Sequence, residues 1–123
     1  ALGHDALVFV RGYPASQAAL ARLDPADPRT AQRFELYMGG MELANGFHEL
    51  TDAREQRQRF ESDQAWRRGQ GKTVPPYDAN LIAALESGLP DSSGVALGVD
   101  RLLMLKLGLP ELRQVLAFSS VNA

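Results

Sequence analysis

The sequence predicts an α+β domain built on an antiparallel sheet with helices on one side. Apolar and polar residues alternate on both sides of a Gly39-Gly40 pair, which is typical of a β-hairpin. Helical segments follow without regular strand–helix–strand alternation, which favours an antiparallel over a parallel sheet. A length of 123 residues, of which 45% are hydrophobic and 23% charged, suits one globular domain.

Composition excludes several classes of function. The net charge of −2 argues against a basic nucleic-acid-binding surface within these residues. The absence of cysteine rules out disulfides, thiolate metal sites and cysteine nucleophiles. No apolar run has the length of a transmembrane helix, and the first residues lack the pattern of a signal peptide. We therefore expect a cytoplasmic protein without a membrane partner.

The first predicted elements precede the hairpin. Residues 7–10 form a short apolar run that predicts a strand buried on both faces, and Tyr13-Pro14 ends it. Ser16 is placed to cap a short helix through Leu23. Two Asp-Pro steps within residues 24–28 then predict a turn-rich link.

The hairpin of residues 33–50 is the element around which the chain is organised. Pairing across Gly39-Gly40 sets Tyr37 opposite Glu42 and Glu35 opposite Ala44, so the two carboxylates and Tyr37 share one face. The other face collects apolar residues and is the expected core: Phe34, Leu36, Met38, Met41 and Leu43.

Asn45-Gly46 interrupts this alternation. Strict alternation sends Asn45 to the apolar face, so we expect a bulge or a strand end here that re-aims Asn45 and, beyond it, Glu49.

Two helices are expected next. Asp52 and Glu55 mark the start of a polar, arginine-rich helix that runs to Arg68. It is either a solvated helix with local ion pairs, which we favour, or an RNA-binding helix. Asp78 caps the following helix, whose apolar stripe contains Leu81, Ile82 and Leu85 and which ends at Gly88-Leu89-Pro90.

A glycine-marked strand of residues 92–99 runs directly into a helix of residues 100–108. Gly94 and Gly98 weaken a strand, which suggests that another group approaches the backbone closely. Arg101 is a local misfit, because a cation near a helix N-terminus is mildly unfavourable, and such misfits are commonest at functional sites. Pro110 opens a last short helix, and residues 115–118 are a candidate closing strand.

Two of these stretches together resemble a known family. Gly94-Val-Ala-Leu-Gly98-Val-Asp-Arg101 resembles motif 3 of the class II aminoacyl-tRNA synthetases, and the hairpin resembles the segment that precedes it in the lysyl-type subgroup. Residues 42–56, Glu-Leu-Ala-Asn-Gly-Phe-His-Glu-Leu-Thr-Asp-Ala-Arg-Glu-Gln, are especially similar to the PoxA/GenX proteins, which attach (R)-β-lysine to a lysine of elongation factor P. The resemblance covers nearly the whole chain.

The resemblance implies that residues 1–123 are the C-terminal portion of a class II catalytic domain, an antiparallel sheet flanked by helices. Motif 3 is present, whereas motifs 1 and 2 are absent, and with them the main dimer-forming segment and the motif 2 arginine. The parent protein is then expected to be a homodimer, and the 123 residues alone are expected to be inactive.

The resemblance also implies roles for individual residues. Glu35 and Glu42 would hold Mg²⁺ ions that bridge the phosphates of ATP, and Arg101 would stack on adenine. The alternatives are exposed strand carboxylates and a surface arginine.

The amino-acid site is implied in the same way. Glu49 would accept the side-chain ammonium of a lysine-like substrate, and Asn45 would orient its surroundings. Gly94 and Ala96 would belong to the floor of this pocket, where lysyl-tRNA synthetases usually have glycine in place of Ala96. The alternative for Glu49 is an acid that compensates the dipole of the following helix.

Neither histidine is assigned chemistry. Adenylation needs no general base when the attacking group is already a carboxylate, so His48 is expected to pack or to form a hydrogen bond. His4 offers no evident partner, and two histidines without further ligands do not make a convincing zinc site.

The implied function is an ATP-dependent ligase that activates lysine or β-lysine as an adenylate and transfers it to a lysine of elongation factor P. Two alternatives stay open at this point: aminoacylation of lysine tRNA, and a synthetase-like binding module that has lost its chemistry.

Overall fold

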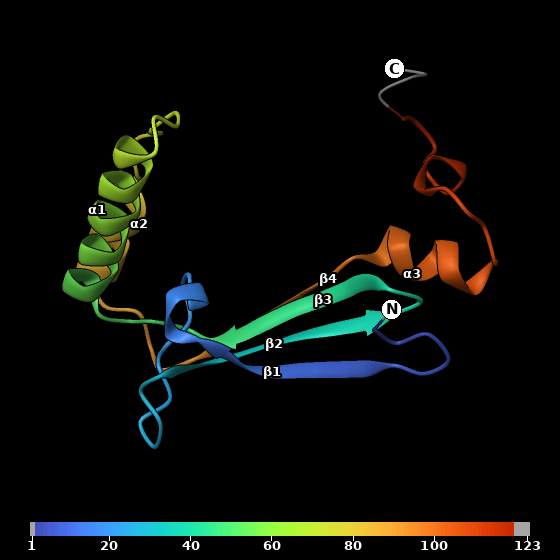
Figure 1. The fold of residues 1–123 in the computed structure, drawn as a ribbon, viewed down its shortest axis with the longest axis horizontal. Coiled ribbons are helices and arrows are strands. Elements are labelled where there is room, and N and C mark those ends of the chain that lie inside the picture. Colours follow the sequence, from blue (N-terminus) through green and yellow to red (C-terminus); the bar gives the residue numbers. More distant parts are fainter. Residues whose placement is uncertain (1, 120–123) are drawn as a thin grey trace. The chain divides into compact units, whose positions relative to one another are not determined.

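The computed structural model describes residues 2–119, which contain four strands, three α-helices and two short 3₁₀ helices (Figure 1). In chain order these are β1 (Val8–Pro14), η1 (Ala15–Gln17), β2 (Thr30–Met38), β3 (Met41–His48), α1 (Ala53–Gly69), α2 (Ala79–Glu86), β4 (Ser93–Leu97), α3 (Val99–Lys106) and η2 (Leu112–Gln114). The strands form one antiparallel sheet in the order β1-β2-β3-β4. The predicted α+β class is therefore confirmed.

The turn between β2 and β3 is Gly39-Gly40, as predicted. Both glycines have positive φ, 60° and 76°. Tight hairpin turns require positive φ, which residues with a Cβ rarely adopt. Because only two residues separate Met38 from Met41, the pairing register of the two long strands is fixed by this turn.

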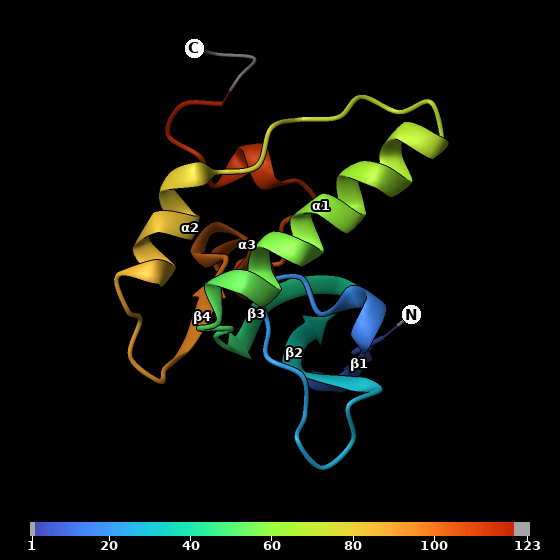
Figure 2. The same cartoon turned by 90° about the vertical axis from the view of Figure 1, so that its left-hand side faces the viewer.

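The described residues divide into two compact units. The first unit comprises residues 2–11, 34–46 and 95–119, and the second comprises residues 12–33 and 47–94. In the first unit, α3 contacts η2, and Met104 of α3 is buried with 4% exposure. In the second unit, α1 and α2 lie side by side (Figure 2). The core of the second unit includes a small cluster of Ala18, Ala21 and Ala31.

Helices α1 and α2 begin where the sequence predicts. The Asp52 carboxylate accepts a hydrogen bond from the Glu55 amide at 2.8 Å and caps α1. The Asp78 carboxylate accepts from Asn80 and Leu81 and caps α2, whose Ile82 and Leu85 are buried. A capping carboxylate satisfies backbone donors that have no partner within the helix.

The polar helix α1 carries local ion pairs. Arg59 pairs with Glu55 at 2.6 Å and Arg67 with Asp63 at 3.1 Å, each one helical turn apart. The residue of α1 that is buried is Gln56. The predicted local ion pairs are thus confirmed, and the choice of a solvated helix over an RNA-binding helix stays a prediction.

The helix predicted from Ser16 to Leu23 is wrong. Only the three residues of η1 are helical, and Ser16 does not cap them. Ala19 has a φ of 52°, in the left-handed region, where a right-handed helix cannot continue. Ala21 and Leu23 instead form isolated antiparallel bridges to Glu49 and Ala31.

Two further predictions about strands are corrected. The first strand begins at Val8 and is not buried on both faces, because Phe9 is 61% exposed. Its strand lies at the end of the sheet order, and the Phe9 ring contacts Phe34 at a centroid distance of 5.6 Å. Residues 115–118 form no strand, and Phe118 is 82% exposed.

No helix within residues 2–119 combines the length and the apolar character needed to cross a lipid bilayer.

Replacing the α1 cap, Asp52→Ala, is expected to lower the free energy of unfolding by about 1 kcal/mol, because the Glu55 amide loses its acceptor. Urea denaturation followed by circular dichroism measures this loss. Glu61→Ala, an exposed acid on the same helix, is the matched control. Equal losses in the two variants would contradict a capping role.

Candidate active site

Glu35 of β2 is a buried carboxylate. Glu35 is 7% exposed, and its Oε2 accepts a short hydrogen bond from the hydroxyl of Tyr37, which lies on the same face of the strand. A carboxylate removed from water needs such donors, because burial without a partner is costly. The predicted face of Glu35 and Tyr37 is therefore correct.

The predicted division into one core face and one carboxylate face holds only in part, since Leu43 of the core face is buried but the carboxylate face is buried as well. Glu35 and Ala44 on the carboxylate face are buried, whereas Leu36 on the apolar face is only half-buried. The Tyr37 side chain, which donates a hydrogen bond to Glu35, covers part of the Glu35 carboxylate.

Glu42 of β3 lies next to Arg101 of α3. The Nη1 of Arg101 donates to the backbone carbonyl of Glu42 at 2.7 Å. The aliphatic part of Arg101 lies over Gly98, where an added Cβ would stand 3.3 Å from its Cδ. The absence of a side chain at Gly98 thus leaves room for this arginine, as the glycine pattern suggested. Arg101 remains exposed, so a ligand in solvent can reach its guanidinium.

A hollow of about 380 Å³ brings Glu42 and Arg101 together with an apolar wall. The wall consists of residues that sequence reasoning did not assign to the site: Met41, Met104, Pro110 and Leu112. The only available signal was their proximity in sequence to Arg101 and Glu42. A charged rim beside an apolar wall suits a ligand that has both a flat apolar part and anionic groups.

The second unit contains a different contact, between Glu49 and Gly94. The backbone N–H of Glu49 donates to the carbonyl of Ser92 at 2.9 Å. A Cβ added at Gly94 would stand only 2.7 Å from the Oε1 of Glu49. The close approach expected at Gly94 is therefore made by the Glu49 carboxylate. A half-buried carboxylate in this position can accept hydrogen bonds from an ammonium group.

Asn45 and Ala96 belong to the first unit. Strand β3 runs from Met41 to His48, so the strand does not end at Asn45-Gly46, and the bulge predicted as the alternative stays a prediction. Asn45 is half-buried, and Ala96 is exposed on β4. The structure thus places the predicted residues in two groups, with Glu35, Glu42, Asn45, Ala96 and Arg101 in the first unit and Glu49 and Gly94 in the second. A single site that uses both groups stays a prediction.

Glu35 and Glu42, the two predicted metal ligands, lie in the first unit. No group of three or more acidic, histidine or cysteine side chains within residues 2–119 could hold a metal ion by itself. Mg²⁺ is commonly bound by one or two carboxylates together with the phosphates of a substrate. That Glu35 and Glu42 hold such an ion together with a nucleotide stays a prediction.

Both histidines are hydrogen-bonded. The ring nitrogens of His48 lie 2.7 Å from Gln32 Oε1 and 2.7 Å from Asp91 Oδ1, which confirms the expected hydrogen-bonding role. His4 was expected to have no partner, but its Nδ1 lies 2.9 Å from Asp5 Oδ1.

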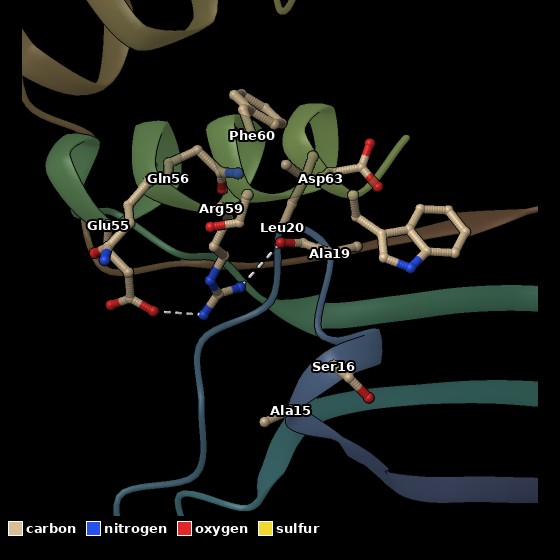
Figure 3. A pocket seen from close by; sticks show the side chains of 12 residues that line it. Ala15, Ser16, Ala19, Leu20, Glu55, Gln56, Arg59, Phe60 and Asp63 are labelled. Atoms are coloured by element: carbon tan, nitrogen blue, oxygen red, sulfur yellow. Dashed lines mark hydrogen bonds and ion pairs between the residues drawn. The ribbon is translucent and has the colours of Figure 1, made fainter. Parts of the chain in front are cut away.

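A larger hollow of about 910 Å³ lies along α1 (Figure 3). None of the predicted site residues lines it. Its arginine, Arg59, donates to the carbonyls of Ala19 and Ala21 at 2.9 and 2.7 Å and to Glu55 at 2.6 Å. Arg59 therefore anchors the segment before β2, and volume alone does not make this hollow the better candidate site.

Comparison with known proteins adds sequence relatives. Residues 2–122 match the family model of the class II tRNA synthetases (D, K and N). Curated relatives named elongation factor P–(R)-β-lysine ligase are similar to the chain over 118 residues: 58% identical in Enterobacter sp. (strain 638) and Klebsiella pneumoniae (strain 342), and 59% in Edwardsiella ictaluri (strain 93-146). Each match covers 96% of this chain and 36% of the relative. The chain thus spans about a third of the length of these relatives.

Gly94→Ala is expected to displace the Glu49 carboxylate, because the new methyl would stand 2.7 Å from Oε1 and the side chain is the part that can move. A crystal structure of the variant measures the displacement. Gly69→Ala is the matched control, since a Cβ there meets no atom within 4 Å. An unmoved carboxylate in Gly94→Ala would contradict the contact.

Proposed function

Because this chain belongs to the class II tRNA synthetases (D, K and N), we propose that its 123 residues are the C-terminal part of the catalytic domain of an ATP-dependent ligase. The ligase activates a lysine-like amino acid and transfers it to a lysine of elongation factor P. The observation that carries the proposal is the hollow in which Arg101 and Glu42 meet, on the two stretches that resemble the family. The names of the relatives, at 58–59% identity, support the choice of substrate and acceptor.

The domain assignment follows from the same premise. Motif 3 is the strand β4, Gly98 and the start of α3, with Arg101 in the first turn. Motifs 1 and 2 belong to the roughly two-thirds of the relatives' length that this chain does not cover. The parent protein is proposed to be a homodimer, because motif 1 is the main dimer-forming segment of the family.

The nucleotide is proposed to bind in the first unit. Arg101 stacks its guanidinium plane on adenine, while the apolar wall around Met104 excludes water from the ring. Glu42 and Glu35 would hold Mg²⁺ through hard carboxylate oxygens, with the phosphates of ATP supplying further ligands. When bound, Mg²⁺ neutralises the phosphates and so lets an anionic nucleophile approach them.

The amino acid is proposed to be selected by its side-chain ammonium. The Glu49 carboxylate at Gly94 accepts the ammonium hydrogen bonds, and Asn45 orients the neighbouring part of the substrate. The Ala96 methyl narrows the pocket floor relative to a glycine. This narrowing suits an amino acid whose α-amino group is displaced, as it is in β-lysine.

The reaction needs little proton transfer in its first step. The substrate carboxylate attacks the α-phosphorus of ATP, and the bond from this phosphorus to the oxygen that bridges the α- and β-phosphates breaks. Pyrophosphate leaves, and the aminoacyl-adenylate remains. The acceptor lysine amine then attacks the activated carbonyl carbon. An amide bond forms, AMP leaves, and the amine loses one proton. The first step requires no general base, which agrees with His48 being bonded to Gln32 and Asp91.

Transfer to lysine tRNA is the second candidate. The family model that matches the chain is that of tRNA synthetases, so the acceptor is the point at which the two functions differ.

The acceptor is tested with the full-length protein that contains this sequence, incubated with ATP, labelled β-lysine or lysine, elongation factor P and lysine tRNA. Label is expected on elongation factor P, with β-lysine preferred. Charging of tRNA alone would overturn the first candidate. The 123-residue chain by itself is the negative control, because it lacks motif 2, and ATP–pyrophosphate exchange by it would contradict the domain assignment.

Arg101→Lys in the full-length protein is expected to raise the KM for ATP about thirtyfold. The lysine ammonium is compact and has no planar group that could stack on adenine as the arginine guanidinium does. ATP–pyrophosphate exchange at varied ATP measures the change. Arg54→Lys, an exposed arginine of α1, is the matched control. An unchanged KM would exclude Arg101 from the nucleotide site.

A further inference from the structure

The second unit contains a polar network centred on Asp91, in the segment between α2 and β4. A single carboxylate oxygen, Oδ1, lies 2.7 Å from His48 Nε2 and 2.8 Å from Arg22 Nη2. The same Arg22 nitrogen donates to Thr51 Oγ1 at 3.2 Å, and the other ring nitrogen of His48 lies 2.7 Å from Gln32 Oε1. His48 and Arg22 therefore meet at Asp91, and each has a further partner, Gln32 for His48 and Thr51 for Arg22.

Backbone hydrogen bonds link this network to Glu49. The N–H of Arg22 donates to the carbonyl of His48 at 2.8 Å, and Ala21 forms an antiparallel bridge with Glu49. On the other side, the N–H of Glu49 donates to the carbonyl of Ser92, the residue that follows Asp91. Glu49 is thus held between two segments, and Asp91 ties both of them to His48.

The charges favour the network at neutral pH. The hydrogen bond from His48, followed by the charge of Arg22, holds the pKa of Asp91 below its usual range against the opposing effect of desolvation. A lowered carboxyl pKa means that the interaction is present above the ordinary value of about 3.9 and is lost as pH falls through the lower folded value. An ionised carboxylate can only accept, so His48 Nε2 carries a proton. The charged groups facing His48 are Asp91 and, through Asp91, Arg22; Gln32 is neutral.

Stabilisation alone is a weak explanation for this arrangement. The Asp91 side chain is 68% exposed, and ion pairs at that exposure contribute little to folding. Asp91 directly precedes Ser92, whose carbonyl accepts from the Glu49 amide, and Gly94, which lies against the Glu49 carboxylate, is two residues further on. Small displacements of a group that orients a substrate have large effects on binding.

We propose that His48, Arg22 and Asp91 form a polar clamp whose role is to position the Glu49 carboxylate against Gly94 for a substrate ammonium. The three are positioning residues, since they act through Glu49. The proposal rests on the proposed function, in which Glu49 receives the ammonium of a lysine-like amino acid.

The kinetic test uses the full-length protein in ATP–pyrophosphate exchange with β-lysine. His48→Ala and Asp91→Ala are each expected to raise the KM for the amino acid about tenfold and to leave the KM for ATP unchanged. The double variant is expected to be no worse than Asp91→Ala, because both changes break the same contact. Asp91→Asn keeps an acceptor oxygen and is expected to recover part of the loss. Glu61→Ala, with an exposed acid removed from α1, is the control.

A second measurement does not depend on activity. Hydrogen–deuterium exchange of the Glu49 amide, which donates to Ser92, is expected to be faster in His48→Ala and Asp91→Ala and unchanged in Glu61→Ala. Unchanged amide exchange, or a KM effect equal for ATP and amino acid, would overturn the clamp. If the wild type exchanges no lysine-like amino acid, the proposed function fails, and the Glu49 amide alone then decides whether the clamp exists.

Discussion

The register between β2 and β3 is the constraint on which the candidate site depends. Two glycines with positive φ close the hairpin in the fewest residues, so the pairing cannot slip without strain in the turn. A slip by one residue would place Glu35 of β2 and Glu42 of β3 on opposite faces of the sheet. The same register places the backbone carbonyl of Glu42 where it accepts a hydrogen bond from Arg101.

Two carboxylates in this fold have contrasting surroundings. Glu35 is buried and satisfied by the Tyr37 hydroxyl on its own strand, whereas Glu49 is half-buried and lies against a glycine. A satisfied carboxylate resists reorganisation and suits a fixed ligand for a metal. The Glu49 carboxylate fills the space that a Cβ at Gly94 would need, and as a half-buried group it can still be reached by an ammonium group. The difference supports separate roles for the two residues within the proposed ligase.

Local signals in the sequence predicted local structure well. The caps of α1 and α2, the Gly39-Gly40 turn and the close approach at Gly94 are each encoded within a few residues, and all are confirmed. The resemblance to class II synthetases is confirmed by the family model that matches residues 2–122. It could be recognised from the sequence because two long motifs occur in the same order as in the family.

Features that depend on distant partners were missed. The burial of Glu35, the exposure of Phe9 and the absence of a strand at residues 115–118 depend on what covers each segment, which no short pattern encodes. The helix expected from Ser16 to Leu23 does not form, because Ala19 adopts a positive φ, which is unusual for alanine. His48 has partners 16 and 43 residues away, so the sequence predicted a hydrogen bond but could not identify Gln32 and Asp91.

The strand β4 has a consequence for handling the protein. It stands at the end of the sheet order, and all five of its residues are exposed, with Val95 at 65% and Leu97 at 47%. An apolar end strand presents a row of backbone donors and acceptors that can template pairing with another chain. A proteolytic or recombinant piece with the limits of this chain would therefore tend to self-associate through β4. Its association would then increase with protein concentration, and substitutions outside β4 would not prevent it.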